Sequence, residues 1–134
     1  MTKILSIDVG EKKVGLATTD ETQMIAAPFG FLDRQDSIPK ILDIITKENI
    51  GQIVVGIPYL PSGGLGSQAE DVQGFVTELR GKTRVGIDFE NEILSSVEAT
   101  NRLKAMRRKI KNKGEVDAMA ATIILEGYLN RIDK

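Results

Sequence analysis

The chain has 134 residues, of which 41% are hydrophobic and 28% charged, a balance typical of one folded domain with a single core. It has no cysteine and no histidine, which excludes disulfides, thiolate zinc sites and imidazole as a general base. Without these two residue types, any catalysis must rest on carboxylates, hydroxyls or lysines. The net charge of −1 argues against a protein that coats nucleic acid indiscriminately.

The sequence also argues against a membrane protein. No apolar run approaches the roughly 20 residues needed to cross a bilayer. The apolar start of the chain is interrupted by Asp8 before the apolar region of a signal peptide could form. We therefore expect a cytoplasmic location.

The first half of the chain alternates between strand and helix patterns. Three short apolar runs separated by turn residues predict a meander of antiparallel strands over 3–8, 14–19 and 24–32. From Ser37 to about Lys47 the apolar residues recur at helical spacing, which predicts a helix. The β-branched run over 52–57, halted by Pro58, predicts a strand covered on both faces.

A second helix is expected from Ser67 to Arg80. Ser67 and Glu70 have the spacing of a capping box, and an apolar stripe follows them. The next apolar run, over 83–89, predicts the fifth strand.

The last third of the chain predicts two more helices. Ser95 and Glu98 form a second capping-box pattern, which starts a helix that a basic stretch and Gly114 interrupt. A final helix is expected from about Glu115, and because it is nearly apolar all round it should pack deeply against the sheet.

This element order predicts an α/β domain with a five-stranded mixed sheet, in which a three-strand antiparallel meander joins parallel strands and helices flank the sheet. In such sheets, ligands gather outside the carboxyl ends of the strands. Asp8 and Glu92 would both lie at this edge.

Three acidic residues are therefore candidates for a metal site. Asp8 ends the first strand, Glu92 follows the fifth, and Asp117 lies in the first turn of the last helix, all near the rim of the sheet where a carboxylate can bind a divalent cation. Each also has an ordinary explanation, since Asp8 could shape a turn and Asp117 could offset a helix dipole. Near Glu92, Asp88 and Glu90 are alternative ligands.

A basic cluster lies between the second and third of these acids. Its cations could offset the dipole of a helix C-terminus or contact nucleic acid phosphates, and the two interpretations have similar weight from the cluster alone. Aromatic residues make up only 4% of the chain, which favours contacts to phosphates over base stacking. The cluster consists of Lys104, Arg107, Arg108, Lys109, Lys111 and Lys113.

Four motifs in order along the chain resemble the YqgF family, whose members are described as candidate Holliday junction resolvases or nucleases that process pre-16S rRNA. The resemblance implies one RNase H-like nuclease domain over residues 1–134. The motifs are Ile4–Gly10 with Gly15–Ala17, then Val54–Pro58, Leu94–Ala99 and Val116–Ala121.

The resemblance further implies a two-metal type of phosphodiesterase in which Asp8, Glu92 and Asp117 are the catalytic residues and hold Mg²⁺ or Mn²⁺. Lys12 and Lys13 stand where the family usually carries basic residues, and with the basic cluster they would contact nucleic acid. The implied substrate is precursor ribosomal RNA, in ribosome biogenesis, or branched DNA, in recombination. The protein would act as a monomer or a homodimer.

Two departures from the family pattern concern positions near the site. Ile93 stands where the family usually has an arginine that could hold a phosphate, and Ser62 stands where it usually has an aspartate. One alternative is a non-catalytic RNA-binding or assembly module. Another is an actin-like ATPase, because Asp8-Val9-Gly10 followed by Gly15 resembles the first phosphate loop of that class, although 134 residues supply only one of the two domains it needs.

Overall fold

The computed structural model of the protein describes residues 1–59, 62, 64–92, 98, 101–102, 104–105 and 113–132. Its elements, in chain order, are β1 (Lys3–Val9), β2 (Lys13–Thr19), β3 (Ala26–Asp33), the short 3₁₀ helix η1 (Arg34–Asp36), α1 (Ser37–Lys47), β4 (Ile50–Ile57), α2 (Ser67–Arg80), β5 (Gly86–Asn91) and α4 (Lys113–Ile132).

The five strands form one mixed sheet in the order β3-β2-β1-β4-β5. β1 at its centre pairs antiparallel with β2 and parallel with β4, β2 pairs antiparallel with β3, and β4 pairs parallel with β5. This confirms the predicted meander with parallel strands added to it.

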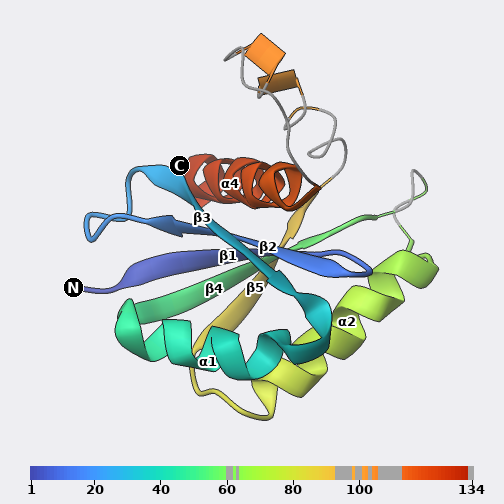
Figure 1. The fold of residues 1–134 in the computed structure, drawn as a ribbon, viewed down its shortest axis with the longest axis horizontal. Coiled ribbons are helices and arrows are strands. Elements are labelled where there is room, and N and C mark those ends of the chain that lie inside the picture. The colour runs from blue at the N-terminus through green and yellow to red at the C-terminus, as the bar shows by residue number, and fades with distance from the viewer. Residues whose placement is uncertain are drawn as a thin grey trace.

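Helices cover both faces of the sheet, with α4 on one face and α1 and α2 on the other (Figure 1). Successive residues of a strand point to opposite faces. In β1, Leu5 and Ile7 belong to the core under α1 and α2, whereas Ile4 belongs to the core under α4. Asp8 has the same parity as Ile4, so its side chain is on the α4 face.

α4 packs closely on the sheet, as its apolar sequence predicts. Ala121 and Leu125 are fully buried in the core under this helix. The buried hydroxyl of Ser6 on β1 donates a hydrogen bond of 2.9 Å to the main-chain oxygen of Ala121. No helix in the described ranges is long and apolar enough to span a membrane.

Two of the expected strands begin later than predicted. β3 begins at Ala26, because the main-chain N–H groups of Met24 and Ile25 bond to the Asp20 carboxylate in the preceding turn. β5 begins at Gly86, three residues after the predicted start at Thr83, whose hydroxyl accepts a local hydrogen bond from the N–H of Val85.

The predicted capping box of α2 is wrong. Gly66 is the N-cap residue, without a side-chain hydrogen bond, and Ser67 is already the first residue of the helix. The helix expected after Ser95 lies mostly outside the described residues.

The last helix begins at Lys113, two residues before the predicted start, so Gly114 lies inside it and does not mark the break before it. Gly114 lies against the ring of Phe31 on β3, where a side chain would collide with the ring. This glycine therefore permits close contact between helix and sheet.

Candidate active site

Asp8 is the penultimate residue of β1, the central strand, at the carboxyl end of the parallel pair. It is held in place by the sheet, where it pairs with Gly15 of β2. Only 8% of the residue is exposed, which is unusual for an aspartate at the end of a strand. Burial rather than exposure in a turn therefore characterises this carboxyl group.

Glu92 directly follows β5, and its main-chain N–H donates to the oxygen of Ile57 at the end of β4. Its side chain meets that of Asp8, with which it shares a hydrogen bond. Burial, the hydrogen bond with Asp8 and the charge of Asp8 together raise the pKa of Glu92 to about 9. The raised pKa of Glu92 thus favours a proton held between the two carboxyl groups, of which that of Asp8 is buried and that of Glu92 half-buried.

Two glycines beside Asp8 make room for this arrangement. Gly15 is the partner of Asp8 on β2, and a side chain there would collide with the main-chain carbonyl of Asp117. On β4, Val55 is the ladder partner of Ile7, and Gly56 is the next residue. A Cβ atom added to Gly56 would lie 2.9 Å from Oε2 of Glu92. Glycine in the interior of a strand indicates such a close approach, and this signal was readable in the sequence.

Asp117 is the fifth residue of α4, two residues further into the helix than predicted, and 4% of it is exposed. The acidic residue of the first turn is Glu115. The dipole explanation for Asp117 is weaker here, because the effect is confined to the first turn. Its main chain lies over Gly15, on the strand next to Asp8.

The other two acids of β5 have different partners. Oδ2 of Asp88 accepts a hydrogen bond of 3.0 Å from the hydroxyl of Tyr128, and Oε1 of Glu90 lies 2.8 Å from Nε of Arg131. Both partners belong to the C-terminal part of α4, away from Asp117. Among the acids of this segment, Glu92 is the one whose carboxyl group meets Asp8.

The donor chemistry of this site suits a hard divalent cation. Carboxylate oxygens are the ligands that Mg²⁺ and Mn²⁺ prefer, and an ion bound between the carboxylates of Asp8 and Glu92 would take the place of a proton held between them. Within the described ranges, no three acidic residues are arranged closely enough to hold an ion together. The structure thus brings Asp8 and Glu92 together and places the main chain of Asp117 nearby, and the three-residue metal site stays a prediction.

The predicted nucleic-acid contacts lie on two segments. Lys12 is exposed in the turn after β1, and the amino group of Lys13 lies 2.7 Å from Oδ1 of Asp33 and over the ring of Phe31. Lys104 is exposed, and only the main chain of Lys113 is described. Outside the described residues lie Arg107, Arg108, Lys109, Lys111 and Ile93.

A family model described as "RuvX: Holliday junction resolvase" matches residues 2–131. A relative from Orientia tsutsugamushi (strain Ikeda) is 41% identical over 134 residues, covering 97% of this chain and 85% of the relative. One from Synechocystis sp. (strain ATCC 27184 / PCC 6803 / Kazusa) is 38% identical over 130 residues, covering 94% of this chain and 86% of the relative. Both relatives are named "Putative pre-16S rRNA nuclease".

The chain belongs to the RuvX family. This confirms the resemblance found in the sequence, since RuvX and YqgF denote one family. Among solved structures, this RuvX protein resembles T. thermophilus RuvC in complex with a Holliday junction substrate, with a TM-score of 0.59 over 98% of this chain and 96% of that one, at 12% identity. It also resembles the yeast mitochondrial Holliday junction resolvase Ydc2, with a TM-score of 0.50 over 96% and 78% of the two chains, at 10% identity.

Identities this low show the fold alone. The RuvX chain has the RuvC-like, RNase H-like fold, as predicted from the sequence.

Proposed function

We propose that this RuvX protein is a metal-dependent nuclease that hydrolyses phosphodiester bonds of structured nucleic acid. The observation that carries this proposal is the contact between the buried carboxyl group of Asp8 and the half-buried one of Glu92, at the edge of the sheet where ligands of such folds bind. The names of the relatives favour pre-16S rRNA as the substrate, in line with the processing of its 5′ end that we propose, and the family description favours Holliday junction resolution.

In this proposal Asp8, Glu92 and Asp117 would hold one or two Mg²⁺ or Mn²⁺ ions. A bound ion of this kind makes water a nucleophile near neutral pH and stabilises the charge on the attacking and leaving oxygens. The chain has no histidine to serve as a general base, which makes metal activation the natural route. The protein's own part is to hold the carboxylates rigidly, through β1 for Asp8 and through the Ile57 contact for Glu92.

Positive charge on either side of the site would hold the substrate. Lys12 lies in the turn that begins two residues after Asp8 and Lys13 is the first residue of β2, so a nucleic-acid strand whose phosphate reaches Asp8 would pass close to them. The basic cluster precedes α4, the helix that carries Asp117. These contacts are to phosphates and carry little sequence information, which suits recognition of shape rather than sequence.

One observation favours a second candidate, a non-catalytic nucleic-acid-binding module. Because a proton can be shared between Asp8 and Glu92, the carboxyl pair is satisfied without a metal ion. The replacement of the family arginine by Ile93 also favours this candidate, because it removes a side chain that could hold a phosphate for cleavage. This candidate predicts binding to nucleic acid with no cleavage in the presence of any metal.

The deciding experiment is a cleavage assay with precursor 16S rRNA fragments and four-way DNA junctions side by side, with Mg²⁺, Mn²⁺ or EDTA. We expect cleavage only with metal, and its loss in Asp8→Asn and Glu92→Gln with nucleic-acid binding retained. Glu90→Gln is the matched control, because it makes the same change two residues away on a side chain paired with Arg131. Full activity of Glu92→Gln, or no cleavage by the unaltered protein, would refute the proposal.

A further inference from the structure

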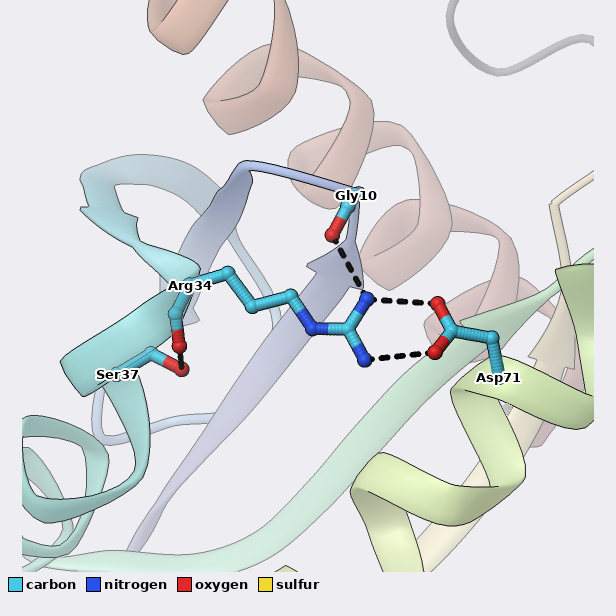
Figure 2. Close-up of polar contacts among 4 residues, drawn as sticks. All are labelled: Gly10, Arg34, Ser37 and Asp71. Atoms are coloured by element: carbon cyan, nitrogen blue, oxygen red, sulfur yellow. Dashed lines mark hydrogen bonds and ion pairs between the residues drawn. The ribbon is translucent and has the colours of Figure 1, made fainter.

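Arg34 joins three elements beside the candidate active site. Its Nη1 group donates to the main-chain oxygen of Gly10 at 3.1 Å and to Oδ2 of Asp71 at 2.6 Å, and Nη2 donates to Oδ1 of Asp71 at 2.9 Å. Figure 2 shows the guanidinium group between the Gly10 carbonyl and the Asp71 carboxylate. Arg34 thus connects the turn after β1 to α2.

The same residue also holds this turn through its main chain. The N–H of Arg34 donates to the oxygen of Lys12 at 2.9 Å, and within the turn the N–H of Gly10 donates to the oxygen of Lys13 at 2.9 Å. The guanidinium carbon lies 5.6 Å from the ring centroid of Phe75 on α2. The turn over residues 10–12 is therefore tied to α2 by one residue, through the guanidinium bond to Gly10 and the main-chain bond to Lys12.

The position of the turn has a consequence for the shape of the surface. The turn and the start of α2 border an open cleft of about 670 Å³. Arg34 and Asp71 lie in its wall, so loss of their ion pair would let the turn move relative to α2. The other lining residues are Glu11, Ser67 and Gln68.

Direct binding of a phosphate by Arg34 is disfavoured. Asp71 already accepts from both Nη groups, in the bidentate geometry that a phosphate would use. The hydrogen bond with Asp71, and the charges of Asp71 and Glu78, raise the pKa of Arg34. The two carboxylates thus offset the charge of the guanidinium group, and both would repel an incoming phosphate.

We propose that Arg34 is a positioning residue, whose bonds to Gly10 and Asp71 hold the turn that carries Lys12 where it meets the phosphate backbone of the substrate. This inference rests on the proposed function, in which Lys12 contacts nucleic acid. Asp8 itself is fixed by the ladder between β1 and β2, so the Arg34 contacts act on substrate binding and not on the carboxylates.

Two variants remove the connection in different ways. Arg34→Lys keeps the charge, but an ammonium group lacks the planar fork that spans Gly10 and both oxygens of Asp71. The double variant Arg34→Met/Asp71→Asn removes the ion pair without changing the net charge. Arg80→Lys is the matched control, because Arg80 donates to the oxygen of Ile87 at 3.0 Å at the other end of α2.

The first measurement is the Kd for a four-way DNA junction and for a pre-16S rRNA fragment over a range of salt, without Mg²⁺ or Mn²⁺. We expect the Kd of both Arg34 variants to rise about tenfold, because a turn that is no longer tied to α2 must then be ordered on binding. The slope of log Kd against log salt should stay unchanged, since the same phosphates are contacted. Arg80→Lys should bind like the unaltered protein.

Cleavage kinetics supply the second measurement. With Mg²⁺ or Mn²⁺, KM should rise by the same factor as Kd while kcat stays within about twofold. A slope smaller by about one in the double variant would show that Arg34 contacts a phosphate itself, and an unchanged Kd would show a purely structural role. Either result overturns the inference.

The two proposals fail in different ways. Absence of metal-dependent cleavage by the unaltered protein overturns the proposed nuclease, and the Kd comparison still decides the role of Arg34. An unaltered protein that binds neither nucleic acid overturns both.

Discussion

Raising the pH should destabilise the metal-free protein, because folding raises the pKa of Glu92. Its ordinary value of 4.5 applies to the unfolded chain, and its value in the folded protein is about 9, chiefly through burial and then through Asp8. A folded state that holds its proton more tightly is most favoured at low pH. The contribution of Glu92 to stability is therefore fully present below pH 4.5 and is lost as the pH rises towards 9.

The size of the effect follows from the width of this window. Each pH unit between the two values removes about 1.4 kcal/mol, so the step from pH 5 to pH 7 removes about 3 kcal/mol from the free energy of unfolding. For a chain of this length, that corresponds to a fall in Tm of about 10 °C. The absence of histidine and cysteine leaves few other groups that titrate in this range, which makes the test specific.

The assay is thermal unfolding in EDTA at pH 5, 6, 7 and 8. The Glu92→Gln variant should show a nearly flat profile, whereas Glu90→Gln should keep the slope of the unaltered protein. Saturating Mg²⁺ or Mn²⁺ should raise the Tm more at pH 8 than at pH 5, since the ion competes with the shared proton. Equal slopes in the unaltered protein and in Glu92→Gln would refute the assignment of a shared proton.

Three further changes test the packing around the site. Gly15→Ala should lower the free energy of unfolding by about 3 kcal/mol in urea titrations, because the new methyl group meets the rigid main chain of Asp117. Gly74→Ala, in α2, should raise it by about 0.5 to 1 kcal/mol, since beyond the adjoining backbone of the helix no described atom lies within 4 Å of the new Cβ position. Tyr128→Phe should cost about 1 to 2 kcal/mol by removing the hydrogen bond to Asp88, with cleavage unchanged.

The sheet was predictable from the sequence because its signals are local. The apolar runs of the strands and the helical spacing from Ser37 each lie within a few turns of chain, and α1 has the predicted bounds. The errors arose where one local signal competed with another. Ser67 matches a capping box, but Gly66 before it supplies the extended N-cap backbone.

Contacts between distant segments were not predictable in this way. The chain has 18 basic and 19 acidic residues, so nothing in the sequence singles out Arg34 and Asp71, which are 37 positions apart, as a pair. In the sequence, Gly114 indicates the end of a helix. Its place inside a helix is explained by the ring of Phe31, which leaves no room for a side chain at this position. Long-range geometry decides both cases.

The carboxyl pair conflicts with what stability alone would favour. A buried acid in contact with a half-buried one loses stability as soon as the pH exceeds the ordinary pKa of a carboxyl group, and a hydrophobic pair of similar volume would avoid this loss. The surrounding structure nevertheless accommodates the pair, since Gly56 leaves space for Glu92 and the sheet fixes Asp8. Violations of the usual rules of burial occur mainly at functional sites, where a ligand offsets their cost. A cation bound by both carboxylates would do so here, and it would stabilise the protein most where the metal-free form is weakest, above neutral pH.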